Sequence, residues 1–112
     1  MNGETVTVET PVDTGRRDAH NKPILEWRPE TVHDVLVAPG PLADIPDTAR
    51  PAGVKVAWGL HFPKTWTKPL RGARISVRSG PPCNVIGDPQ PYTLENTPTR
   101  WWLPVELARA DG

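Results

Sequence analysis

The sequence predicts an all-β protein, a small single-domain β-barrel of about six short strands joined by long loops. Apolar and polar residues alternate with a period of two in several short segments, which is typical of strands with one buried face. The chain contains 15 prolines and 9 glycines, and prolines inside a helix are strongly unfavourable. With 112 residues in total, we expect residues 1–112 to form a single barrel.

The first part of the chain predicts two strands and a loop between them. Residues 5–12 alternate as a half-buried strand. Residues 13–23 are rich in turn residues and have no period, which predicts a polar hairpin loop. Residues 24–27 are expected to resume pairing until Pro29 interrupts them, and residues 31–38 alternate again as a second strand.

The second part of the chain predicts the remaining strands. Residues 54–62 have the clearest alternation, with an apolar residue at every second position. Residues 70–78 and 84–86 form two strands separated by a Gly/Pro turn, and residues 100–109 form the last strand. Pro104 places that last strand at an edge or at a bulge, because proline has no N–H to donate. The expected core residues are Val56, Trp58, Leu60, Ile75, Val77, Leu103, Val105 and Leu107.

Charge and cysteine content restrict the possible partners and the compartment. Thirteen basic and thirteen acidic side chains cancel, so no net field favours nucleic acid or a membrane surface. A single cysteine, Cys83, excludes an internal disulfide and fits a reducing compartment. The sequence has no apolar run of about 20 residues and no secretory leader, so we expect synthesis in the cytoplasm and no membrane partner.

The chemically reactive residues form no recognisable catalytic or metal-binding pattern. His20, His33 and His61 lack the spacing of metal ligands, and both His33 and His61 are expected to be half-exposed on strands. Cys83 lies in a Pro-Pro-Cys-Asn turn with no group that would lower the pKa of its thiol. No carboxylate pair and no phosphate-binding glycine loop is present. The sequence therefore predicts no catalytic, cofactor or metal site, and a protein that is not an enzyme.

Five tryptophans are many for a chain of this length. Trp58 and Trp101 fall on apolar strand faces and are expected in the core, whereas Trp102 points to the opposite side. Trp27 and Trp66 lie in loops, where a tryptophan either contacts a partner or covers the open end of a barrel. The residues that we expect at a subunit or partner interface are Trp66, Lys68 and Trp102.

Because basic residues lie near Trp66 in the sequence, a nucleic-acid-binding surface is one alternative. An aromatic and basic groove would use Trp66, Lys64, Lys68 and Arg71. The alternative is a solvated face balanced by acids, which the zero net charge favours.

The order of the segments resembles the head-to-tail stopper family of long-tailed bacteriophages, also called head completion or head–tail joining proteins. The similar segments cover nearly the whole chain, and none is specific by itself. They are residues 5–8, residues 18–23, the strand 32–38 before a long loop, Val54–Pro63, Leu70–Val77, the Val85-Ile86-Gly87-Asp88-Pro89 segment, and Trp102–Arg109.

The resemblance implies a structural virion protein with no catalytic activity. Members of the family are small β-barrels that form a ring below the portal and adaptor, close the DNA channel after packaging, and provide the surface to which the tail attaches. The implied partners are other copies of the chain in a six-fold or twelve-fold ring, the adaptor, the tail terminator, and packaged DNA without sequence specificity. The implied location is the virion, after synthesis in the host cytoplasm. Alternatives are another virion ring protein, such as a tail terminator, and a small β-barrel that binds nucleic acid.

The long Pro-rich loop at residues 39–53 is the candidate channel loop, because in this family the corresponding connection projects toward the channel. Fifteen residues without a period are too many for a simple strand connection. The candidate plug residues are Leu42, Asp44, Asp47 and Arg50, and the two aspartates would discourage DNA phosphates from sticking. The alternative is a mobile surface loop without a role.

Overall fold

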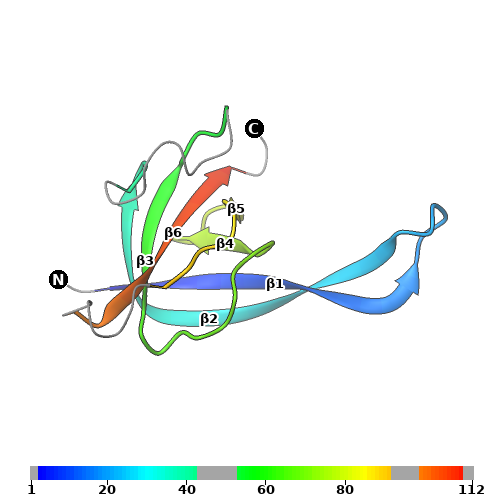
Figure 1. The fold of residues 1–112 in the computed structure, drawn as a ribbon, viewed down its shortest axis with the longest axis horizontal. Helices are drawn as coiled ribbons and strands as arrows, with labels where there is room; N and C mark the ends of the chain where they lie inside the picture. The colour runs from blue at the N-terminus through cyan, green and yellow to red at the C-terminus, as the bar shows by residue number, and fades with distance from the viewer. Residues whose placement is uncertain (1–2, 43–52, 92–98, 110–112) are drawn as a thin grey trace.

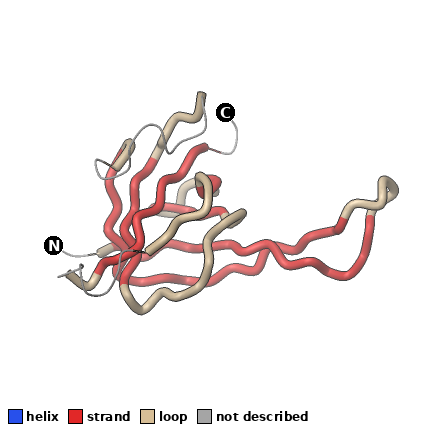
Figure 2. Tube along the Cα trace, viewed as in Figure 1, coloured by secondary structure: helices blue, strands red, loops and turns tan. Residues whose placement is uncertain are grey.

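The structure is a computed structural model that describes residues 3–42, 53–91 and 99–109. These residues form six strands and no helix, so the prediction of an all-β protein is confirmed (Figures 1 and 2). The strands are β1 (Glu4–Arg17), β2 (Pro23–Pro39), β3 (Trp58–Pro63), β4 (Arg74–Val77), β5 (Cys83–Val85) and β6 (Trp101–Arg109).

The strands pair in a closed circuit, and every pair is antiparallel. The order is β1-β2-β3-β6-β5-β4, and β4 pairs back to β1 through Val6–Val77 and Glu9–Arg74. No strand therefore lies at an open edge over its whole length, although several have only one neighbour over part of it.

The interior of the closed sheet holds the hydrophobic core. Leu60 and Phe62 of β3 and Val105 and Leu107 of β6 are fully buried, and each pair is separated by a polar residue, the half-buried His61 or the buried Glu106. Six of the eight expected core residues are buried: Leu60, Ile75, Val77, Leu103, Val105 and Leu107. Trp58 is only half-buried against the core, and Val56 is half-buried before β3 begins.

The predicted loop at residues 13–23 is wrong over most of its length. β1 continues to Arg17 and β2 begins at Pro23, so only residues 18–22 form the turn. Asp18 organises this turn, because its Oδ1 accepts hydrogen bonds from the backbone N–H groups of His20 and Lys22, both at 2.9 Å. The hydrogen bonds of the Asp18 side chain thus fix the turn, although no apolar alternation marks the strands beside it in the sequence.

Residues 10–28 form a two-stranded arm that projects from the closed sheet. β4 pairs with β1 only at Val6–Glu9, so from Thr10 onward β1 has β2 as its single neighbour. The arm extends along the longest axis of the molecule, which measures 49 Å against 30 and 28 Å for the others (Figure 1). Because each arm strand has an open side, Pro11 and Pro23 fit there, and Pro29 does not interrupt β2.

The predicted strand at residues 54–62 is also partly wrong, since β3 begins only at Trp58. Ala57 still donates from its backbone N–H to the Leu107 oxygen at 2.7 Å, so the chain joins β6 just before the strand begins. The predicted strand at residues 70–78 shortens to β4, because Gly72 has a positive φ and a turn ends at Ala73. The remaining two predicted strands match β5 and β6 within a residue.

Pro104 lies in the interior of β6 but beside only one other strand. β3 pairs with β6 at Pro104, whereas β5 reaches β6 only from Leu107 to Arg109. Among the described strands, none therefore pairs with the other side of β6 at Pro104. The prediction of a local edge is confirmed, although β6 as a whole lies between two strands.

Candidate interaction surfaces

The arm carries the exposed large hydrophobic side chains of the described residues. Ile24, Leu25 and Trp27 are 38%, 49% and 37% exposed, and all three lie on β2 within the arm. Exposed apolar side chains gathered on one projecting element indicate a contact surface for another protein.

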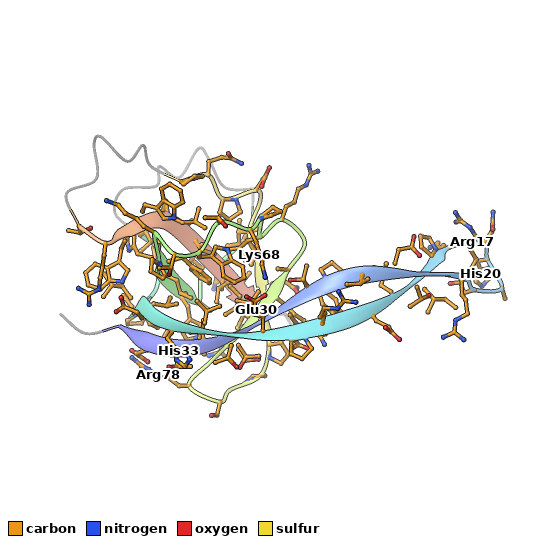
Figure 3. All side chains as sticks on the ribbon, turned by 90° about the horizontal axis from the view of Figure 1, so that it is seen from below. Arg17, His20, Glu30, His33, Lys68 and Arg78 are labelled. Atoms are coloured by element: carbon orange, nitrogen blue, oxygen red, sulfur yellow. The ribbon has the colours of Figure 1, made fainter. Side chains whose placement is uncertain are left out.

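The end of the arm is basic. Arg17 and His20 lie at this end of the molecule in Figure 3, and Arg16 and Lys22 are neighbours in the chain. The Arg17 guanidinium donates to the Asn21 oxygen at 3.1 Å, which holds it against the turn. The arm thus combines an apolar surface with positive charge at its tip.

Four tryptophans are each covered by a cation that also binds a carboxylate, and we call these groups the carboxylate–cation–indole clusters. In each cluster the cation lies 3.9–5.6 Å from the indole centroid and 2.6–3.1 Å from a carboxylate oxygen in its ion pair. Such geometry combines an ion pair with a cation–π contact. The clusters are Glu9–Arg74–Trp27, Glu4–Arg78–Trp58, Asp34–Arg100–Trp101 and Glu30–Lys68–Trp66.

Asp34 is the centre of the most elaborate cluster. It has a φ of 64° within β2, at a bulge where the β1–β2 register shifts between Glu4 and Val6. Its carboxylate accepts two hydrogen bonds from Arg100, at 2.6 and 3.1 Å, and its carbonyl oxygen accepts one from Trp101 Nε1 at 2.8 Å. The bulge therefore ties β2 to the start of β6, which is two strands away.

The ion pairs shift the pKa values of their members. Hydrogen bonds from Arg100 lower the pKa of the Asp34 carboxyl, and those from Arg78 lower the pKa of Glu4. The pKa values of both arginines rise, since hydrogen bonds to their carboxylates favour the charged guanidinium. These groups are structural, because each one binds a partner within the chain.

The clusters weaken the nucleic-acid alternative. Lys68, which the groove would need, binds Glu30 at 2.6 Å, and both side chains lie together in Figure 3. Arg74 and Arg78 bind Glu9 and Glu4, so these cations are already balanced by acids on neighbouring strands. A phosphate would have to compete with a carboxylate at each position.

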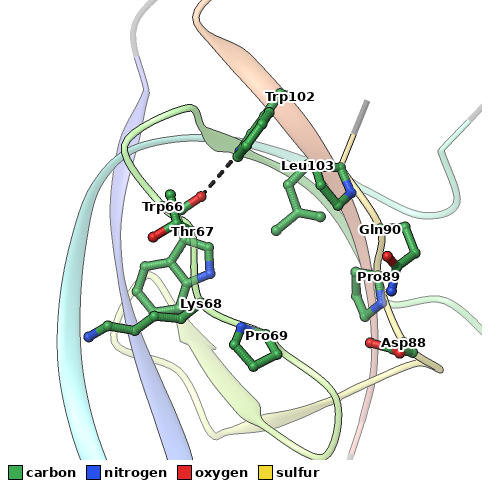
Figure 4. Close-up of a pocket in the computed structure, with 10 residues that line it drawn as sticks. Trp66, Thr67, Lys68, Pro69, Asp88, Pro89, Gln90, Trp102 and Leu103 are labelled. Carbon is green, nitrogen blue, oxygen red and sulfur yellow. Dashed lines mark hydrogen bonds between the residues drawn. The ribbon is translucent and has the colours of Figure 1, made fainter. Parts of the chain in front are cut away.

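The expected interface residues lie close together, but Trp66 is not exposed. Trp66 is 6% exposed and packs edge-on against Phe62, with 5.5 Å between ring centroids. Trp102 is half-buried, and its Nε1 donates to the Trp66 oxygen at 3.2 Å (Figure 4). Of the three, Lys68 is exposed and Trp66 belongs to the core, so Trp66 cannot offer its ring faces to a partner.

The start of the candidate channel loop is anchored to the closed sheet. The Leu42 backbone N–H donates to Glu106 Oε2 at 2.9 Å, and the Leu42 side chain is buried over Gly59. Glu106 is itself buried, at 3% exposure. Leu42 is therefore part of the folded body rather than of a swinging loop, while Asp44, Asp47 and Arg50 lie outside the described residues.

Two of the histidines and the cysteine lie on strands. His33 is exposed and lies with its Nδ1 3.0 Å from Thr5 Oγ1, and His61 is half-buried on β3. Cys83 is buried at the start of β5. Within residues 3–42, 53–91 and 99–109, no group of three histidine, cysteine, aspartate or glutamate side chains could hold a metal ion. In the same ranges no helix is long and apolar enough to cross a membrane.

Comparison with known proteins gives no match: neither a protein-family model nor a curated protein is significantly similar to this chain.

The length of the arm and the clusters are hidden in the sequence for different reasons. The arm has no apolar alternation because both of its faces meet solvent, so the period-two signal is absent. The clusters join residues up to 74 positions apart, so local spacing does not reveal them. The available signal is compositional: many charges with a net charge of zero, together with an excess of tryptophan.

Proposed function

We propose that this chain is a structural subunit of the bacteriophage head–tail connector, a head-to-tail stopper that assembles as a ring below the portal and adaptor. The ring closes the DNA channel after packaging and provides the surface for the tail. The observation that supports this most is the arm, because a long projecting hairpin with exposed Ile24, Leu25 and Trp27 suits contacts between subunits.

The closed circuit of six strands fits the small barrel on which that family is built. Pro11 and Pro23 interrupt the hydrogen-bonding edges of the arm, so the arm would engage neighbours through its side chains rather than by adding strands. That mode of contact suits a closed ring, because strand addition at open edges can continue without limit.

The channel loop keeps its role in this proposal with one revision. Leu42 anchors the loop to the body, so the plug residues are Asp44, Asp47 and Arg50. Deleting residues 43–48 is expected to leave tail joining intact and to release DNA from filled heads. Normal DNA retention after this deletion would show that the loop is not a plug.

The test uses the phage that encodes this chain. With a stop codon in its gene, DNA-filled heads and free tails should accumulate separately, and the wild-type chain supplied in trans should restore joined particles. The variant Ile24→Ser/Leu25→Ser should fold but fail to restore them, whereas the matched arm variant His20→Ser should succeed. Joined, infectious particles in the absence of the chain would refute the proposal.

The same experiment distinguishes a tail terminator. A stopper should copurify with tail-less heads, whereas a terminator should copurify with free tails.

A further inference from the structure

A groove lies between the loop that follows β3, the segment at residues 88–91 and the start of β6 (Figure 4). It has a volume of about 250 Å³. Its lining combines two tryptophans, Leu103 and three prolines with the polar residues Thr67, Lys68, Asp88 and Gln90; the tryptophans are Trp66 and Trp102. The prolines are Pro69, Pro89 and Pro91.

The groove contains a buried hydrogen-bond donor for which the described part of the chain offers no acceptor. Trp66 Nε1 is closed to water and has no hydrogen-bond partner among the residues that the structure describes, and in Figure 4 the nitrogen edge of the indole faces the space between Pro69 and Leu103. The backbone groups of Trp66 are satisfied, since its N–H donates to the Pro63 oxygen and its oxygen accepts from Trp102. Buried donors of this kind are rare, because an unpaired N–H that is closed to water costs free energy. A ligand that brings a hydrogen-bond acceptor would remove this cost.

The ring of Trp66 is held in place, so the donor points in a fixed direction. Phe62 packs against it with an interplanar angle of 64°, and Lys68 lies 5.6 Å from its centroid. Lys68 is in turn fixed by Glu30. A ligand therefore meets the N–H edge of the indole rather than a ring face.

The chemistry of the wall favours an extended segment that contains prolines. Such a segment in the polyproline II conformation offers carbonyl acceptors and flat apolar rings, and its prolines have no N–H groups to leave unpaired in the groove. Tryptophan and proline walls pack against proline rings, and Lys68 and Asp88 at the rim supply one charge of each sign.

Other ligand classes fit less well. The volume is below the ~300–1,000 Å³ that is usual for small-molecule sites. A nucleic-acid base would need an open indole face for stacking, whereas the Trp66 ring packs against Phe62 and lies under Lys68.

We propose that this groove docks an extended proline-containing segment of another protein, one of whose backbone carbonyls accepts the hydrogen bond from Trp66 Nε1. Docking parts the groove wall enough for the carbonyl to reach the nitrogen. This site is separate from the arm, and the proposal does not depend on ring assembly.

The test follows the indole N–H signals of the full chain by NMR during titration with a polyproline peptide. The Trp66 signal should move downfield and saturate at peptide concentrations up to about 5 mM, which corresponds to a weak single-segment contact. A Gly-Ser peptide of equal length should leave it unchanged. No movement of the Trp66 signal, or equal movement with both peptides, would overturn the proposal.

Two variants locate the contact. Trp66→Phe keeps an aromatic ring, removes the donor and should weaken binding about three- to tenfold. Because that change touches the core, Pro89→Ala/Pro91→Ala provides a second variant that alters only the wall and should weaken binding while the Trp66 signal stays in place without peptide. The matched control is Pro81→Ala/Pro82→Ala, which alters prolines outside the groove and should bind as the wild type does. Equal binding by all variants would overturn the proposal.

The protein alone provides the last control. If the Trp66 signal moves with protein concentration and polyproline does not reverse the movement, a second copy of this chain occupies the groove and the proposal is wrong.

Discussion

Asp34 adopts a left-handed backbone conformation inside a strand, and its contacts explain why. The bulge turns its carboxylate toward Arg100 and its carbonyl oxygen toward the Trp101 indole, while the Arg100 guanidinium lies 3.9 Å from the Trp101 ring centroid. Gly3 packs so closely on the Asp34 backbone that a Cβ would collide with it. The strained residue is thus stabilised by contacts to β6 and to the start of the chain.

Replacing Asp34 by asparagine is expected to destabilise the protein at pH 7 but not in acid. Asparagine tolerates the positive φ, so the change removes the charge with little backbone strain. The pKa of Asp34 is lower in the folded protein than in the unfolded chain, so its stabilisation is complete above the unfolded value of about 3.9 and is lost as the pH falls through the folded value. Urea unfolding at pH 7 and below pH 4 measures the difference between variant and wild type.

The matched control for this prediction is Asp88→Asn, at an exposed position on another segment. It should leave the urea unfolding midpoint at pH 7 unchanged. A difference for Asp34→Asn that stays constant from neutral pH into acid would show that the ion pair with Arg100 contributes nothing.

At the scale of single elements, the turn between β4 and β5 is tight and strained. Gly80 donates to the Val77 oxygen at 2.9 Å, and the two central residues, Arg78 and Ser79, have φ values of 53° and 60°. Positive φ at both positions defines a type I′ turn, which matches the twist of a hairpin but favours asparagine and glycine. Arg78 accepts this conformation while its side chain binds Glu4 and covers Trp58.

Ser79→Gly is therefore expected to stabilise the protein by about 0.5–1 kcal/mol, because glycine adopts positive φ without strain. Chemical unfolding with an unchanged denaturant slope measures the gain. The contrasting change Gly80→Ala should not stabilise, since its Cβ would come 3.1 Å from the Val77 oxygen. A destabilised Ser79→Gly variant would mean that the serine side chain makes a contact more important than the strain.

The strands differ in how well their positions can be predicted from the sequence pattern. β6 and β3 follow a period-two pattern because one face is buried. β6 was predicted within a residue at both ends, and β3 within a residue at its C-terminal end but four residues too early at its start. Residues 13–23, the outer part of the arm, were predicted as a loop because solvent on both faces removes that pattern, whereas residues 10–12 and 24–27 were correctly expected to pair. Trp66 was expected either at a partner contact or over the open end of the barrel, and the loop that carries it folds over the core and buries it. The alternation of apolar and polar residues indicates which strand face is buried, but it does not indicate which distant segment of the chain covers a side chain.

At the scale of the whole molecule, stability depends on a small core that every strand shares. Phe62 is fully buried and contacts Trp66 at the end of the core near the groove. Phe62→Ala is expected to cost about 3–5 kcal/mol, a large share of the 5–15 kcal/mol that stabilises a typical domain. Phe62→Leu keeps most of the volume and should cost less than about 1.5 kcal/mol.

Thermal unfolding followed by circular dichroism and by tryptophan fluorescence measures both variants. The two signals should change together, since the strands of the closed circuit lose their pairing as one unit. Equal stability of Phe62→Ala and the wild type would show that the core near the groove is loosely packed.

Local stability is expected to differ between the two halves of a single strand, β1. In β1, residues Val6–Glu9 pair on both sides and include the fully buried Val8, whereas Thr10–Arg17 pair only with β2. A two-stranded ribbon is marginally stable by itself, and few buried contacts hold the arm. Amide hydrogen exchange should therefore be slow at the hydrogen-bonded positions of Val6–Glu9, where it requires global unfolding, and much faster beyond Thr10. Equal protection along the whole of β1 would mean that the arm is as stable as the closed sheet. The arm would then be a rigid extension of the body and not an element that becomes fully ordered only when it binds a partner.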